Sequence, residues 1–172
     1  MNTKKMTTNA ILIAVGAILH YVTPMIGVPM QPDFALAMLF IIMVLNSDYK
    51  TTLICGIVIG IFTALTTKTP GGQIPNITEK IITSNIMYLV LIPLRNRINK
   101  TAQMSILLIL GTLVSGTTFL LILSALVGLT GGASIMNLFI GIVLPTVVLN
   151  LIIGTIIYKI VEKIIIKNNT LL

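Results

Sequence analysis

The sequence predicts an all-α integral membrane protein: a bundle of six transmembrane helices with both termini in the cytoplasm. Three observations support this prediction. Of the 172 residues, 56% are hydrophobic and 9% are charged, whereas a soluble domain carries about 25% charged residues to keep its surface wetted. Short polar segments divide the chain into six apolar stretches. The basic residues gather at both ends and on alternate connections between those stretches.

We expect the six stretches to form a single transmembrane domain over residues 1–172. They cover approximately residues 9–26, 33–46, 51–67, 77–94, 103–129 and 134–161. A helix needs about 20 residues to cross the hydrocarbon, so the second and third stretches are short, and we expect their ends to lie within protein. The last stretch contains Pro145, which predicts a kink. The first has a basic start but no small-residue cleavage site, so we expect a retained helix rather than a signal peptide.

The distribution of Lys and Arg predicts the orientation of the helices. With the amino end inside, only Lys68 and Lys80 fall on the outer side. The inner side receives nine basic residues: Lys4, Lys5, Lys50, Arg95, Arg97, Lys100, Lys159, Lys163 and Lys167. Basic residues stay in the cytoplasm, and only an even number of spans puts both basic ends there. The net charge of +7 therefore predicts contact with lipid headgroups and no nucleic-acid partner.

Motifs of enzymes and cofactor sites are missing from the sequence. It has one His and one Cys, and neither H-E-x-x-H nor G-x-S-x-G occurs. The glycine-rich segment at residues 70–73 (PGGQ) lacks the G-K-[ST] of a phosphate-binding loop. We therefore expect no enzyme, no metal and no cofactor. If the protein moves a solute uphill, the energy comes from a gradient or a partner.

Polar residues cluster at the outer ends of the first four stretches, and they are the candidate binding residues. They are His20, Asp33, Gln73, Asn76, Glu79 and Lys80. Asn76, Glu79, Lys80 and Thr83 lie on one helical face because they are spaced by three or four residues. Ionisable groups at membrane depth usually line a cavity or pair with each other. The pattern therefore predicts a site for a small polar molecule near the outer face.

Each of these residues also has a structural interpretation. Asn76 followed by Glu79 resembles a capping box at the start of a helix. Lys80 is placed to extend toward the membrane interface, and a lone His20 is often an interior or interfacial group. Asn150, deep in the last stretch, is interpreted as a hydrogen-bonding contact between helices.

Small residues form two stripes at helical spacing. The first stretch carries Ala10, Ala14 and Ala17, and the third carries Gly56, Gly60 and Ala64. Small side chains let helices approach closely in lipid. The stripes therefore predict either packing within the bundle or docking of another membrane subunit.

Several segments resemble one known family. They are GAILH at residues 16–20, QPD at 31–33, TALTT at 63–67, PGGQIPN at 70–76 followed by Glu79 and Lys80, GTLVSG at 111–116, VLP at 143–145 and VLN at 148–150. On these segments the chain resembles the tryptophan transporter (TrpP) family, within the S components of energy-coupling-factor (ECF) transporters. S components are six-helix substrate-binding subunits. The resemblance covers nearly the whole chain, and PGGQIPN is its most specific part.

The resemblance implies tryptophan uptake across the bacterial plasma membrane, energised by a separate module of two ATPases and a coupling membrane subunit. Glu79 or Asp33 would then accept the ammonium of the amino acid. Lys80, Asn76 and free amides at the helix start would receive its carboxylate. Tyr88 is a candidate wall for the indole.

Three other functions stay open at this point. An S component for another small metabolite, such as a vitamin, would differ in pocket details that the sequence does not fix. A membrane enzyme would use Asp33, His20 and Glu79, although these residues match no catalytic motif. A non-transporting assembly subunit built around the small-residue stripes would leave the outer polar residues unexplained.

Overall fold

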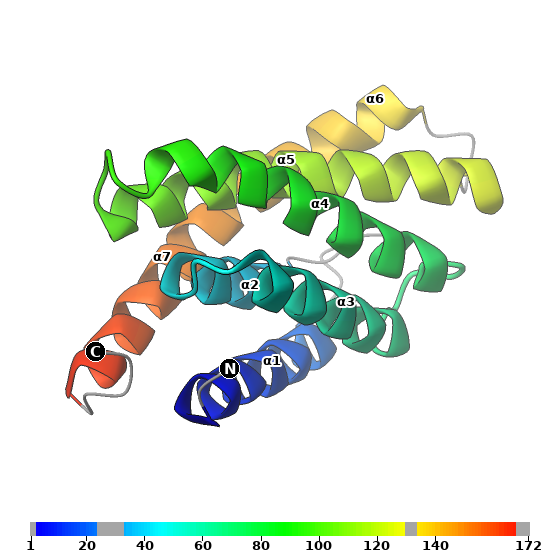
Figure 1. Ribbon diagram of the computed structural model, residues 1–172. Helices are drawn as coiled ribbons and strands as arrows, with labels where there is room; N and C mark the ends of the chain where they lie inside the picture. Colours follow the sequence, from blue (N-terminus) through cyan, green and yellow to red (C-terminus); the bar gives the residue numbers. More distant parts are fainter. Residues whose placement is uncertain (1–2, 24–32, 130–133, 168–172) are drawn as a thin grey trace.

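The computed structural model describes residues 3–23, 33–129 and 134–167. Within these ranges the chain is all-helical and contains no strand. The helices are α1 (Thr3–Val22), α2 (Phe34–Leu45), α3 (Tyr49–Leu65), α4 (Gln73–Leu94), α5 (Lys100–Leu126), α6 (Ile135–Leu138), the π-helical turn η2 (Phe139–Val143) and α7 (Leu144–Lys167). Because α6, η2 and α7 follow one another without a break (Figure 1), the six apolar stretches correspond to six helical rods.

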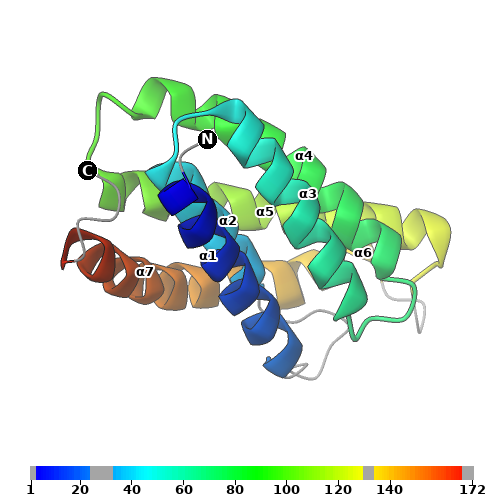
Figure 2. The same cartoon turned by 60° about the horizontal axis from the view of Figure 1, so that its bottom comes forward.

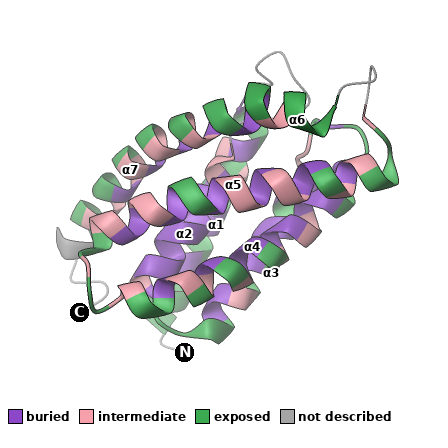
Figure 3. Cartoon of the chain, turned by 90° about the horizontal axis from the view of Figure 1, so that it is seen from above, coloured by how far each residue is buried: buried purple, intermediate pink, exposed green. Residues whose placement is uncertain are grey.

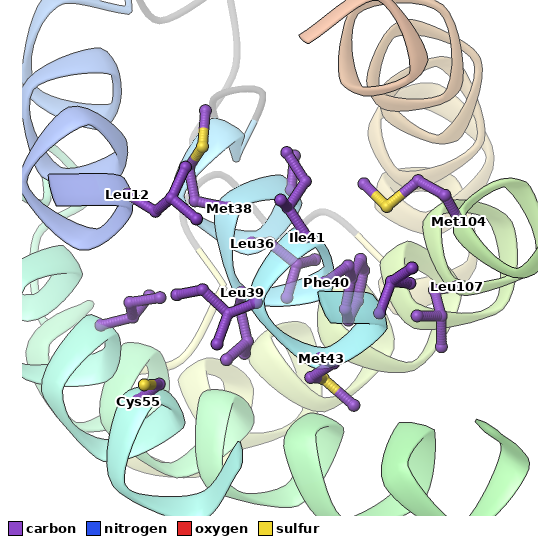
Figure 4. Close-up of a cluster of buried hydrophobic side chains, with 14 of the residues drawn as sticks. Leu12, Leu36, Met38, Leu39, Phe40, Ile41, Met43, Cys55, Met104 and Leu107 are labelled. Atoms are coloured by element: carbon purple, nitrogen blue, oxygen red, sulfur yellow. The ribbon is translucent and has the colours of Figure 1, made fainter. Parts of the chain in front are cut away.

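Helix α2 is the centre of the fold. All ten residues from Ala35 to Val44 are buried, as expected for a helix that is hydrophobic on every side. Figure 4 shows side chains of α1, α3 and α5, among them Leu12, Cys55 and Leu107, around those of α2. At 12 residues, α2 is about 18 Å long, too short to cross about 30 Å of hydrocarbon alone. The expectation that the ends of this stretch lie within protein is therefore confirmed for α2.

The outer helices expose many large apolar side chains. Along α7, Val148, Ile152, Ile156 and Ile160 are each more than half exposed and recur every four residues, which places them on one face. Figure 3 shows that the exposed residues lie on the outer sides of the helices, around the buried α2. Four segments are long and apolar enough to cross a membrane: α1, α4, α5 and Ile135–Ile164. Apolar surface of this extent is suited to lipid rather than water.

The expected kink at Pro145 takes the form of a π-helical turn. Proline has no N–H to donate and its ring crowds the preceding turn of an α-helix. The preceding residue, Leu144, donates its N–H to Phe139, five residues back. This wider turn η2 lies directly before the proline, and π-turns of this kind are recognised sites of helix distortion.

The start of α4 differs from the sequence interpretation. The helix begins at Gln73, with Gly72 as its cap residue, rather than near residue 77. Pro75 therefore occupies the first helical turn, where its missing N–H costs nothing. Asn76 and Glu79 lie beyond the cap, so Glu79 does not form a capping box. That structural interpretation of Glu79 is wrong.

The two stripes of small residues have different surroundings. Gly56 and Gly60 face α4, because a Cβ atom on Gly56 would lie 2.8 Å from Ser84 Oγ and one on Gly60 would lie 3.2 Å from the Cα of Ile77. Ala64 is also buried. The stripe on α3 is thus packing within the bundle, which corrects its prediction as a docking surface.

The stripe on α1 lies on the surface. Ala10 and Ala14 are exposed, and Ala17 is partly exposed. Figure 2 shows α1 lying across α2 and beside α3, with its other side uncovered. Docking through this stripe stays a prediction.

The basic ends of the helices gather on one side of the bundle. In Figure 1 the start of α1, the end of α7 and the connections α2–α3 and α4–α5 all lie on the left. Hydrogen bonds link two of these connections, because Arg95 donates to the carbonyl oxygens of Met43 at 3.0 Å and Asn46 at 2.9 Å. The α3–α4 connection lies at the opposite end.

The close approach of α5 to α2 yields a test of the central position of α2. A Cβ atom on Gly111 would lie 2.1 Å from Cζ of the buried Phe40, whereas one on Gly141 would meet nothing within 4 Å. We expect Gly111→Ala to destabilise the purified protein by about 1–3 kcal/mol, as overpacking does, and to lower its melting temperature. Gly141→Ala is the matched control and should leave it nearly unchanged. Equal melting temperatures for the two variants would contradict this packing.

Candidate functional site

A cavity lies between α2, α4, α5 and the η2–α7 segment. It is lined by His20, Asp33, Leu36, Thr67, Thr69, Asn76, Glu79, Thr112, Ser115, Gly116, Phe119, Val143, Thr146 and Asn150. Thr67 and Thr69 belong to the α3–α4 connection, at the end of the bundle away from the basic residues. Thr112 lies near the middle of α5, so the cavity extends from that end toward the centre of the bundle.

A buried ion cluster forms one wall of the cavity. The Lys80 ammonium on α4 pairs with two carboxylates, those of its neighbour Glu79 and of Asp33 at the start of α2. The Lys80 side chain is fully buried and those of Glu79 and Asp33 are 1% and 16% exposed. Ser115 on α5 donates a hydrogen bond of 2.6 Å to the second oxygen of Glu79. The cluster thus joins α2, α4 and α5.

The folding of α2 and α4 positions the three charged groups. Asp33 caps α2, since its Oδ1 accepts the N–H of Leu36 at 3.0 Å while its Oδ2 pairs with Lys80. Glu79 and Lys80 are both buried in the second turn of α4. When both carboxylates are ionised, the cluster has one negative charge in excess. Because buried charge is costly unless it is paired, this wall favours a cationic group in the cavity.

The mouth of the cavity is polar. His20 Nδ1 lies 2.8 Å from Thr66 Oγ1, which itself donates to the carbonyl oxygen of Phe62 at 2.7 Å. Asn76 donates from Nδ2 to the carbonyl oxygen of Gly72 at 2.7 Å. These contacts fix His20 and Asn76 against the connection that leads into α4.

Not every predicted site residue reaches the cavity. His20, Asp33, Asn76 and Glu79 line it, whereas Lys80 lies behind them and Gln73 is exposed at the start of α4. Lys80 does not extend to the membrane interface, because both carboxylates enclose its ammonium.

Tyr88 belongs to the opposite end of α4. Its hydroxyl donates to the carbonyl oxygen of Ser47 at 3.2 Å, and its ring lies 5.1 Å from that of Tyr49. Nine residues of helix separate Tyr88 from Glu79, which is about 13 Å along the axis. Tyr88 therefore does not line this cavity.

The sequence interpretation missed the contribution of α5 and α7. Thr112 and Ser115 are spaced by three residues on the buried face of α5, and Phe119 follows one turn later. Asn150, interpreted as a contact between helices, does donate from Nδ2 to Thr112 Oγ1 at 3.1 Å, but it also lines the cavity. The signal was the spacing of polar residues within the fifth apolar stretch.

The ion cluster predicts how substitutions at Lys80 affect stability. Lys80→Met leaves two buried carboxylates without their cation, and we expect a loss of about 3–5 kcal/mol of stability. The triple variant Asp33→Asn, Glu79→Gln, Lys80→Met should be more stable than Lys80→Met alone. Melting temperatures in detergent measure both effects. A Lys80→Met variant as stable as the unsubstituted protein would contradict the pairing.

Comparisons with known proteins agree on one family. The family described as "Tryptophan transporter TrpP" matches residues 2–166. A "Probable tryptophan transport protein" of Clostridium perfringens is 51% identical over 127 residues, which cover 69% of this chain and 70% of the relative. A protein of Clostridium acetobutylicum with the same description is 46% identical, and the match covers 69% of this chain and 70% of the relative. Another, from Bacillus subtilis, is 39% identical, and that match covers 69% of each chain. No solved structure matches the chain significantly. The chain therefore belongs to the tryptophan transporter TrpP family.

Proposed function

We propose that this protein takes up tryptophan across the bacterial plasma membrane and binds it in the cavity beside Glu79. The observation that carries the proposal is the pairing of two carboxylates, those of Asp33 and Glu79, with the single ammonium of Lys80, which leaves one negative charge in excess when both carboxylates are ionised. The ammonium of a zwitterionic amino acid would neutralise that charge. The family and its relatives supply the choice of tryptophan.

The groups of an amino acid find complementary partners around the cavity. Glu79 is the partner for the ammonium, since its oxygens face the cavity wall and accept from Ser115. Lys80 is already paired with both carboxylates, so we assign the ligand carboxylate to the mouth instead. There the Thr67 hydroxyl accepts the N–H of Thr69 at 3.3 Å and keeps its own proton to donate. Leu36, Phe119 and Val143 offer apolar surface for an indole.

We propose a single domain over residues 1–172 with six spans and both termini in the cytoplasm. The gathering of the basic helix ends on one side supports this orientation. The cavity then opens toward the outside, because the α3–α4 connection lies at the opposite end. Lys80 does not count in the balance of surface charges, since it is buried in the ion cluster.

We further propose that the chain is an S component whose transport is energised by a separate module of two ATPases and a coupling membrane subunit. The exposed face of α1 with Ala10 and Ala14 is the proposed contact with the coupling subunit, joined by the partly exposed Ala17. Small side chains there would allow close approach of a partner helix. The stripe on α3 is not included, because it packs against α4.

The absence of Trp from the sequence makes ligand binding directly observable. Excited to the red of tyrosine absorption, the protein without ligand should be nearly dark, and bound tryptophan should emit to the blue of its emission in water. Glu79→Gln should weaken binding by about 1.5–3 kcal/mol, the value of a hydrogen bond to a charged group. Tyr88→Phe, on the same helix but outside the cavity, is the control and should bind normally.

Two results would contradict this assignment. No blue shift with the unsubstituted protein, together with a melting temperature raised by some other metabolite such as a vitamin, would exclude tryptophan as the ligand. Normal tryptophan binding by Glu79→Gln would remove Glu79 from the site.

The docking face on α1 has its own test. Ala14→Trp should abolish co-purification with the coupling subunit while tryptophan binding stays intact, because Ala14 is exposed and does not line the cavity. Gly60→Leu should instead destabilise the protein itself, since Gly60 contacts the backbone of α4. Co-purification of Ala14→Trp at normal yield would remove this face from the proposal.

A further inference from the structure

One buried polar atom in the cavity has no role in the packing of the bundle. Asn150 on α7 is 1% exposed and lines the cavity. Its Nδ2 donates to Thr112 Oγ1 at 3.1 Å. Its side-chain carbonyl oxygen, Oδ1, has no hydrogen-bond partner among the described residues. Buried polar atoms are nearly always hydrogen-bonded, so each exception in a native structure calls for an explanation.

The position of this oxygen within the cavity follows from the packing around α5. The α3–α4 connection, with Thr67 and Thr69, forms the outer end of the cavity. Gly71 of that connection lies against Val127, just after the end of α5, because a Cβ on Gly71 would lie 2.4 Å from Cγ2 of Val127. Of the residues of α5 that line the cavity, Thr112 is the one farthest along the helix from Val127. Thr112 and its partner Asn150 therefore form the inner end of the cavity.

The inner end is separated from the ion cluster by about one helical turn. On α5, Thr112 contacts Asn150, and Ser115 contacts Glu79. Three residues of helix correspond to about 4.5 Å along the axis. A ligand with an ammonium at one end and a ring N–H at the other can satisfy both Glu79 and Asn150. An aliphatic or phenyl side chain at the same place would leave the Asn150 oxygen unpaired.

We propose that the side-chain carbonyl of Asn150 accepts the ring N–H of the ligand and thereby selects an indole over apolar side chains of similar size. The inference rests on tryptophan binding in this cavity and adds the residue that determines specificity. Thr112 acts as a positioning residue, because its hydroxyl accepts from Nδ2 and so turns Oδ1 away from α5. A site built to hydrogen-bond a substrate N–H rejects analogues that lack it, since its own polar group is left unpaired.

The test compares tryptophan with 3-benzothienylalanine, in which sulfur replaces the ring N–H and the ring shape is kept. Equilibrium dialysis of the purified full-length chain in detergent measures both dissociation constants. The unsubstituted protein should prefer tryptophan by about 10- to 100-fold, the effect of leaving one buried acceptor unpaired. Asn150→Leu should lower this preference to near unity by weakening tryptophan binding while benzothienylalanine still binds. Thr112→Val should reduce the preference less.

Asn9→Leu is the matched control. Asn9 is also a buried Asn with an unpartnered amide atom among the described residues, but it contacts Asn46 near the basic end of the bundle. This variant should keep the full preference for tryptophan. Equal binding of tryptophan and 3-benzothienylalanine by the unsubstituted protein would by itself overturn the inference. So would an Asn150→Leu variant that loses both ligands equally. Failure of the unsubstituted protein to bind tryptophan at all would instead overturn the proposed function.

Discussion

The pairing of the Lys80 ammonium with Asp33 and Glu79 is the constraint on which the rest of the structure depends. It connects the start of α2 to the second turn of α4, and Ser115 extends the connection to α5. Removing the Lys80 ammonium leaves two buried carboxylates without their cation. In the proposed function the same cluster receives the ligand, because two carboxylates around a single ammonium favour a further cation when both are ionised. Stability and the proposed ligand recognition then come from one set of residues.

The fold places this cluster at the edge of the apolar core around α2. Helix α2 is short and buried on every side, so the capping residue Asp33 at its start reaches the interior of the bundle rather than a membrane surface. The glycines of α3 let α4 approach closely, which holds Glu79 and Lys80 inside. The π-helical turn before Pro145 brings Val143 and, further on, Thr146 and Asn150 to the opposite wall. Packing features that seem unrelated in the sequence thus shape a single cavity.

The sequence predicted the helices well and the site in part. Long apolar stretches with polar punctuation locate helices through hydrophobicity alone, and the short second stretch correctly indicated a helix enclosed by protein. The polar face of α4 was visible because its residues recur at helical spacing. The pairing of Lys80 with Asp33 was not visible in the sequence. Asp33 precedes Lys80 by 47 residues, and only the packing of α2 on α4 brings them together. Tyr88 was assigned to the ligand site by residue type, without regard to its position along α4. Thr112 and Ser115 were not assigned to the site because they lie within a long apolar stretch.

The central claim is that the excess negative charge of the cluster receives the ammonium of the ligand. Its most direct test compares the dissociation constants of tryptophan, tryptamine and indole-3-propionate for the unsubstituted protein. Tryptamine keeps the ammonium and lacks the carboxylate, whereas indole-3-propionate keeps the carboxylate and lacks the ammonium. We expect indole-3-propionate to bind at least about 10-fold more weakly than tryptophan, because a hydrogen bond to a charged group is lost and the excess negative charge of the cluster stays uncompensated. Tryptamine should retain more of the affinity. Binding of indole-3-propionate as tight as that of tryptophan would contradict the claim.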